Sequence, residues 1–181
     1  WANDSDWPEL VHNIRHRVGL NSGEMVTGNM GSSMRMNYTM MGDTVNLAAR
    51  LEPAAKHYGV YILVSEHTQK AVEDFFEWRF LDFLRVKGKT KPVRGYELIS
   101  LKNEMTKDQS QLVQAFDEGI KLYNKQEWTK AKKLFKESLS MEEKFIDRPT
   151  TPSEVYLDRC DYFKAEPPGK NWDGIWTMKT K

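Results

Sequence analysis

The 181-residue sequence has one cysteine, no long apolar run and almost no net charge. A single thiol, Cys160, cannot form an internal disulfide, so we expect a reducing, cytoplasmic compartment. The 27 basic and 26 acidic side chains nearly cancel, which removes the electrostatic argument for binding nucleic acid or an acidic membrane. No apolar stretch approaches the length of a membrane span and no signal peptide begins the chain, so we expect no membrane contact by this segment. A larger parent protein could still be anchored through an upstream region.

In the first hundred residues, short apolar strand patterns alternate with helical patterns. Strands are expected at 17–21, 38–41, 61–64, 78–86 and 95–99, and helices at about 43–57 and 65–75, with a glycine-rich loop between the first two strands. Asp43 or Thr44 is suited to cap the first helix, and Gly59 to follow its end. Strands interleaved with helices predict an α/β sandwich in which helices pack on a sheet.

The composition changes after about Lys102, where the chain becomes rich in lysine and glutamate. Apolar residues at helical spacing over 108–142 flank a short polar turn at 124–127, which predicts an antiparallel helical hairpin. Its glycine, tryptophan and alanine spacing resembles one tetratricopeptide repeat. A further helix is expected from Thr151 onward.

Three parts are therefore expected along the chain. Residues 1–103 are expected to form the α/β part, and residues 104–164 the helical hairpin with an extra helix. Residues 165–181 are expected to form an extended C-terminal segment that packs through Trp172 and Trp176. One repeat and a partial one are fewer than a stable solenoid needs, so the helical part should dock on something.

The most informative stretch runs from Arg17 to Glu52 and reads RVGLNSGEMVTGNMGSSMRMNYTMMGDTVNLAARLE. Its expected helix places Asn46 and Arg50 four residues apart, so both side chains lie on one helical face. An amide and a permanently charged guanidinium presented together suit a phosphate chain better than an apolar core.

This stretch, above all YTMMGDTVNLAARLE at 38–52, resembles the second half of the catalytic domain of class III nucleotide cyclases, which make cyclic AMP or cyclic GMP. The resemblance covers roughly residues 14–100. It implies part of the ferredoxin-like class III cyclase fold, with a small α-helical hairpin as an appendage. It also implies an adenylate cyclase, a lyase that converts ATP to cyclic AMP and pyrophosphate.

The resemblance implies a role for each of four residues. Asn46 would orient the ribose and Arg50 would stabilise the pentavalent phosphorus. Thr39, just after the strand tyrosine, would contact the base and favours adenine. Lys89, in the VKGK loop, would hold the terminal phosphates, with Lys87 as the second choice. Each residue alone also has an ordinary explanation, such as a backbone hydrogen bond for Asn46 or a surface ion pair for Arg50.

Members of this family carry two metal-binding aspartates and a base-reading lysine upstream of the matching segment. Asp4 and Asp6 lie in a polar run and are poor metal ligands, so the ligands for Mg²⁺ or Mn²⁺ are expected outside this chain. The missing N-terminal half of the domain and a second copy in a homodimer are the implied partners, with the active site shared between copies. We expect this chain alone to be inactive, and to be ordered only beside the missing half or another copy.

Two alternatives remain open at this stage. A guanylate cyclase differs only in its base contacts, and the Thr39 hydroxyl can either donate or accept a hydrogen bond. A catalytically silent domain could instead bind partners through the aromatic stripe of its helical tail.

Overall fold

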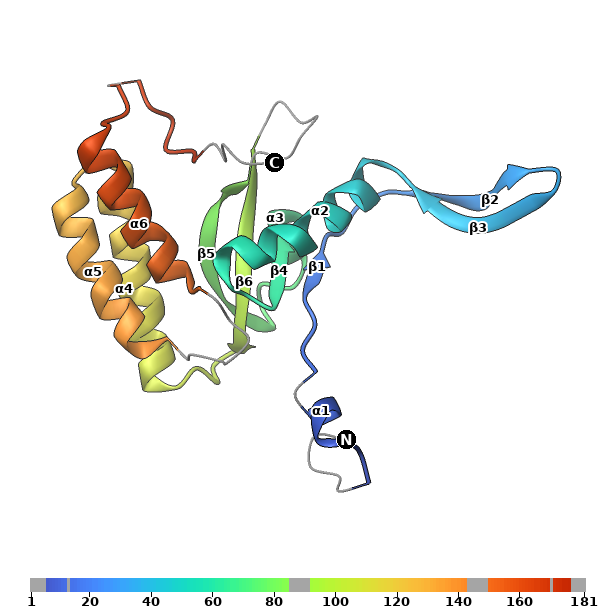
Figure 1. Ribbon diagram of the computed structural model, residues 1–181, viewed down its shortest axis with the longest axis horizontal. Helices are drawn as coiled ribbons and strands as arrows, with labels where there is room; N and C mark the ends of the chain where they lie inside the picture. The colour runs from blue at the N-terminus through green and yellow to red at the C-terminus, as the bar shows by residue number, and fades with distance from the viewer. Residues whose placement is uncertain (1–5, 13, 85–91, 143–149, 170, 177–181) are drawn as a thin grey trace.

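A computed structural model describes residues 6–12, 14–84, 92–142, 150–169 and 171–176 (Figure 1). The fold is mixed α/β, as the sequence predicted. Its main sheet has the strand order β1-β4-β6-β5, in which β1 and β4 are parallel and the other pairs are antiparallel. These strands are β1 (Val18–Leu20), β4 (Ile62–Ser65), β5 (Phe76–Leu84) and β6 (Val93–Leu101).

Helices α1 (Glu9–His12), α2 (Asp43–Tyr58) and α3 (Glu66–Ala71) belong to the first half of the chain. The third is shorter than expected, because the chain leaves the helix at Val72 and begins β5 at Phe76. The Ser65 side chain caps α3 by accepting a hydrogen bond from the Thr68 amide, as its sequence position suggested.

A second, two-stranded sheet consists of β2 (Val26–Ser32) and β3 (Arg35–Met41). Figure 1 shows this hairpin projecting away from the rest of the molecule. The sequence predicted β3 but assigned β2 to a glycine-rich loop, which was wrong. Gly28 and Gly31 interrupt the apolar alternation of β2, so its strand character depends on pairing with β3 and not on its own pattern.

Helix α2 has one buried face, formed by Leu47, Leu51, Ala55 and Tyr58. Asp43 and Thr44 do not cap it, contrary to expectation: the N-cap is Gly42, at φ 143°, with no side-chain hydrogen bond. Only glycine adopts that backbone conformation readily. The expected end is confirmed, because Gly59 follows Tyr58 in the left-handed conformation at φ 64°.

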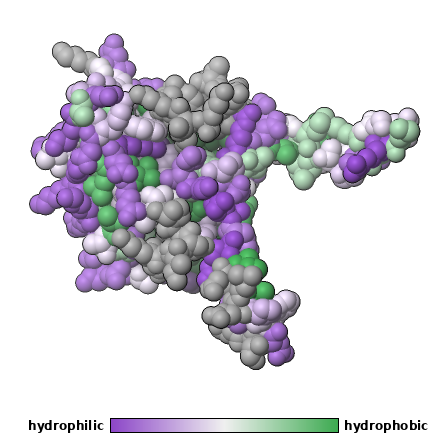
Figure 2. Space-filling view, viewed as in Figure 1, coloured by the Kyte–Doolittle hydropathy of each residue, from purple (hydrophilic) through white to green (hydrophobic). Residues whose placement is uncertain are grey.

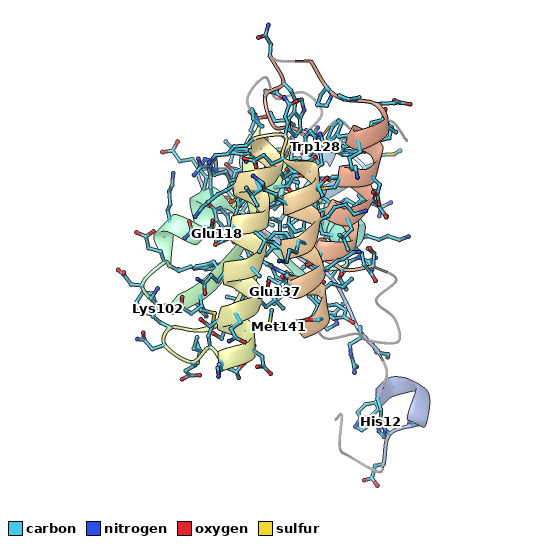
Figure 3. The ribbon with its side chains drawn as sticks, turned by 90° about the vertical axis from the view of Figure 1, so that its left-hand side faces the viewer. His12, Lys102, Glu118, Trp128, Glu137 and Met141 are labelled. Carbon is cyan, nitrogen blue, oxygen red and sulfur yellow. The ribbon has the colours of Figure 1, made fainter. Side chains whose placement is uncertain are left out.

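The second half of the chain forms α4 (Lys107–Asn124), α5 (Trp128–Met141) and α6 (Pro152–Ala165). The expected hairpin and extra helix are confirmed. Figure 3 shows α4 and α5 side by side, with Trp128 at one end of α5 and Met141 at the other. A Cβ on Gly119 would lie 2.7 Å from the Phe135 ring, so glycine at this position permits the close approach of α4 and α5.

We name α4, α5 and α6 the helical tail. The helical tail and the sheet share one hydrophobic core, which runs from Leu51 on α2 through Leu81 on β5 to Phe116 and Tyr156 on the tail. The tail therefore docks on the α/β part of its own chain. This contact satisfies the expectation that a short helical array needs a partner surface.

Candidate functional site

Asn46 and Arg50 lie one turn apart on the exposed side of α2, opposite its buried face. The apolar residues Leu47 and Leu51 immediately follow them in sequence and fix the helix against the sheet. Packing of one face therefore holds the other face, with the amide and the guanidinium, toward solvent. The structure brings together the two residues that the sequence predicted would act together.

The middle of α2 lies in close contact with β1, and its first turn is held by Asn21. A Cβ on Gly19 would come within 2.6 Å of the Ala48 carbonyl oxygen and 2.5 Å of the Glu52 amide, so the helix backbone lies directly on the strand. The Asn21 side chain donates to the Thr44 carbonyl at 2.9 Å and accepts from the Ser65 hydroxyl. An exposed ion pair joins Arg17 to Glu52 at 3.1 Å. The contacts of Gly19 and Asn21 set the position of the turns that carry Asn46 and Arg50, whereas the exposed ion pair contributes little.

Thr39 lies on the projecting hairpin, where β3 pairs it with Gly28 of β2. Its side chain is exposed. The hairpin also exposes several large apolar side chains, among them Val26, Met36 and Tyr38, the last at 72%. Figure 2 shows this arm with much of its surface in the apolar colours. A lone two-stranded hairpin cannot bury a face by itself, and an apolar patch on a projecting arm indicates a contact surface.

Lys89 and Lys87 lie outside the described residues, so the structure does not place the expected phosphate-binding lysine. Among the described residues, no group of three or more histidine, cysteine, aspartate or glutamate side chains could hold a metal ion. Within the same ranges, no helix is both long and apolar enough to cross a bilayer.

A buried polar cluster lies where α2, β5 and the helical tail meet. We call Tyr58, Asp82 and Arg159 the α2 anchor. Arg159 on α6 donates to the Asp82 carboxylate at 2.6 Å and to the Tyr58 hydroxyl at 3.2 Å, and that hydroxyl donates to Asp82 at 2.7 Å. Burial alone would lower the pKa of Arg159, but the Asp82 carboxylate raises it well above its ordinary value. Burial, reinforced by Asp82, raises the pKa of Tyr58. The arginine therefore stays charged and the tyrosine stays protonated.

A bulge in β5 creates part of this arrangement. The β5–β6 register shifts between Phe80 and Asp82, so Leu81 is the extra residue. Its carbonyl accepts a hydrogen bond from the Tyr156 hydroxyl on α6 at 2.7 Å. The bulge turns both Leu81 and Asp82 inward and leaves a backbone acceptor that the helical tail satisfies.

A second buried cluster joins β5 and β6 to the ends of α5 and α6. Arg79 donates to Glu97 at 2.8 Å and to Glu142, and its guanidinium lies 4.9 Å from the centre of the Phe116 ring on α4. Glu142 also accepts from the Ser153 hydroxyl at 3.1 Å, in the first turn of α6. We call Arg79, Glu97 and Glu142 the sheet clasp. Unlike the α2 anchor, it contains no α2 residue.

The sequence offered only a weak signal for either cluster. Arg79 and Asp82 are charged residues within the aromatic strand FEWRFLDFL, where an outward-facing position would explain each equally well. Their partners Glu142 and Arg159 lie 63 and 77 residues further along the chain. Periodicity reports which face of an element is apolar, and it cannot pair charges at that separation.

The chain belongs to the adenylate and guanylate cyclase catalytic domain family, whose model matches residues 4–100. It is 33% identical over 147 residues to "Adenylate cyclase, terminal-differentiation specific" of Dictyostelium discoideum, a match that covers 79% of this chain and 7% of the relative. It is 37% identical over 88 residues to "Adenylate cyclase 1" of Rhizobium meliloti strain 1021, covering 49% of this chain and 13% of the relative.

A solved structure, the adenylyl cyclase CyaB from P. aeruginosa, is 34% identical and superposes with a TM-score of 0.41, over 49% of this chain and 44% of that one. The chain spans a small fraction of the length of the curated relatives above. The Dictyostelium match is longer than the range of the family model, so it extends into the helical tail.

Proposed function

We propose that this chain forms part of an adenylate cyclase, which converts ATP to cyclic AMP and pyrophosphate. The observation that carries the proposal is the exposed pair of Asn46 and Arg50 on α2, one turn apart, in a chain that belongs to the cyclase family. The names of the two curated relatives support ATP as the substrate.

Each proposed site residue has a chemical role that its side chain can perform. The Arg50 guanidinium offers several planar donors and a permanent charge, which suit the negative charge that builds on the phosphoryl oxygens during cyclisation. The Asn46 amide can both donate to and accept from a ribose hydroxyl. Thr39 would contact the base and Lys89 the terminal phosphates. We propose that these four residues form one half of a site.

The other half of the site is proposed to come from outside this chain. Cyclases of this family use divalent metal ions, and the described residues hold no cluster that could ligate one. From the resemblance to the family, we propose that Mg²⁺ or Mn²⁺ is bound by residues of an upstream half of the catalytic domain. The exposed apolar side chains of the hairpin support a homodimer, because a second copy would cover them.

We propose that the chain has three parts. Residues 1–103 are the cyclase portion, 104–164 a tetratricopeptide-like helical part and 165–181 an extended C-terminal segment. The close contact between Gly119 and Phe135 supports the likeness to a helical repeat. The aromatic side chains of this part, including Phe135 and Tyr156, are buried in the core that it shares with the sheet. That burial counts against a silent interaction module, since the aromatic stripe already has its partner.

The experiment is to incubate the full-length protein that contains these residues with ATP and with GTP separately, in the presence of Mn²⁺. Cyclic AMP formation well above cyclic GMP formation is the expected result. Faster conversion of GTP would favour the guanylate cyclase alternative, for which the Thr39 hydroxyl has suitable chemistry. No cyclic product from either nucleotide would contradict the proposal.

A further inference from the structure

The α2 anchor connects the helical tail to the helix that carries the proposed site. Tyr58 is the last residue of α2, and its hydroxyl both accepts from Arg159 of α6 and donates to Asp82 of β5. All three side chains are buried. Arg159 is also enclosed by aromatic rings, with Tyr156 at 4.9 Å and Trp176 at 5.1 Å from its guanidinium carbon. A buried, stacked and doubly hydrogen-bonded arginine has little freedom to move.

The C-terminal turns of α2 depend on such tertiary contacts. Pro53 lies inside the helix, between Arg50 and Tyr58, and has no amide hydrogen to donate to the turn before it. The hydrogen-bond ladder of α2 is therefore weaker at this point. Asn21 holds the first turn of α2 and β1 lies against its middle, around Ala48 and Glu52, so the α2 anchor is the polar attachment of its C-terminal end.

We propose that Arg159 is a positioning residue for the reaction: it fixes the C-terminal end of α2 through Tyr58, and so fixes the orientation in which Asn46 and Arg50 are presented. This inference rests on the proposed function for its catalytic consequence, although the mechanical link itself does not. Arg50 precedes Tyr58 by two turns, about 12 Å along the helix axis. A small tilt at the anchored end would displace the Arg50 guanidinium, and misplacement by about 1 Å can cost roughly a hundredfold in rate.

A pair of hydroxyl deletions tests the link without removing any ring or charge. Tyr58→Phe removes the hydroxyl that joins Arg159 to α2. Tyr156→Phe is the matched control: it removes an equally buried hydroxyl between the helical tail and the sheet, whose hydrogen bond is made to the Leu81 carbonyl and not to a residue of α2. Both variants keep their aromatic contacts and are expected to fold.

Two readouts are measured on the full-length protein: the amide hydrogen exchange of residues 43–58, and kcat and KM for ATP. For Tyr58→Phe we expect exchange in the last turns of α2 to be roughly fivefold faster and kcat to be roughly tenfold lower, with KM within about twofold of wild type. Tyr156→Phe should leave both readouts close to wild type.

A second variant tests Arg159 directly. Arg159→Lys keeps the positive charge near Asp82 but lacks the planar fork that reaches two partners at once. It should lower kcat as Tyr58→Phe does, and the double variant should lose little more, because both changes break the same link. Additive losses would overturn the proposal, as would equal effects of Tyr58→Phe and Tyr156→Phe.

The exchange measurement distinguishes failure of this inference from failure of the proposed cyclase function. If the wild-type protein makes no cyclic nucleotide, the exchange measurement still decides whether the anchor holds α2. Unchanged exchange in Tyr58→Phe would then overturn the mechanical link itself.

Discussion

Loss of the Arg79 guanidinium should destabilise the protein strongly. Arg79 is only 2% exposed and faces two carboxylates, Glu97 and Glu142, whose side chains are 14% and 1% exposed. Replacing Arg79 with methionine keeps most of the volume but leaves the Glu142 charge buried without its cation. One oxygen of Glu142, Oε2, already lacks a hydrogen-bond partner within the described residues. Breaking a buried pair in this way costs about 3–5 kcal/mol.

The free energy of unfolding is measured by urea denaturation of the purified protein, followed by circular dichroism. Lys132→Met is the matched control, since its ion pair with Asp161 likewise joins two elements, α5 and α6, but is solvent-exposed at Asp161. It should cost less than about 1 kcal/mol. Adding Glu142→Gln to Arg79→Met should recover a large part of the loss, because it removes the stranded charge. A cost for Arg79→Met no larger than that of the control, or no recovery in the double variant, would refute the reasoning.

Three further predictions concern pH, the end of α2 and the hairpin. Burial raises the pKa of Asp117 from 3.8 to about 6, against the opposing charges of Lys121 and Arg79. The folded state then holds this proton more tightly than the unfolded state, so stability falls as pH rises from about 4 to 6. Asp117→Asn should remove that pH dependence and raise the free energy of unfolding at pH 7 by about 1 kcal/mol, after allowance for partial solvent exposure. Urea unfolding at a series of pH values measures both quantities, and an unchanged pH dependence would contradict the prediction. Gly59→Ala should lower the free energy of unfolding by more than about 2 kcal/mol in the same assay, because the new Cβ would lie 1.8 Å from the Thr150 carbonyl oxygen and the backbone φ is positive. Gly28→Ala is the control: its Cβ would meet open space, so stability should change by less than about 0.5 kcal/mol. Replacing Met36 and Tyr38 by serine should shift the protein toward monomer in sedimentation velocity, and an unchanged sedimentation profile would argue against the hairpin as a dimer contact.

Local rules were enough to predict much of the fold. The helix at about 43–57 was predicted from its residues, and Gly59 correctly marked its end. Thr151 followed by Pro152 correctly marked the start of α6, where Thr151 forms a capping box with Glu154. These features depend on residues within a turn or two of one another.

Features that depend on distant residues were not predictable in the same way. The strand β2 is stabilised by its pairing with β3, which its glycines conceal. The docking of the helical tail depends on the sheet clasp and the α2 anchor, whose members come from α2, β5, β6, α6 and the residue that ends α5. A charged residue in a strand pattern suggests an exposed position, and only the folded chain shows that Asp82 and Arg159 are buried together.

The same contrast between local and distant determinants applies to the candidate site. The shared face of Asn46 and Arg50 was predictable from the helical period alone. The exposure of Thr39 on a projecting arm was not, because it depends on where the hairpin leaves the body of the protein.

The central claim is tested most directly by the steady-state kinetics of Arg50→Ala beside Arg17→Ala in the full-length protein. Arg17 is the matched control, an exposed arginine just before β1 that forms an ion pair with Glu52 of the same helix. If Arg50 meets charge that exists mainly in the transition state, Arg50→Ala should lower kcat for ATP by at least roughly a hundredfold while KM changes by less than about threefold. Arg17→Ala should keep both constants near wild type. Equal losses in kcat and affinity, or equal effects of the two variants, would contradict the account.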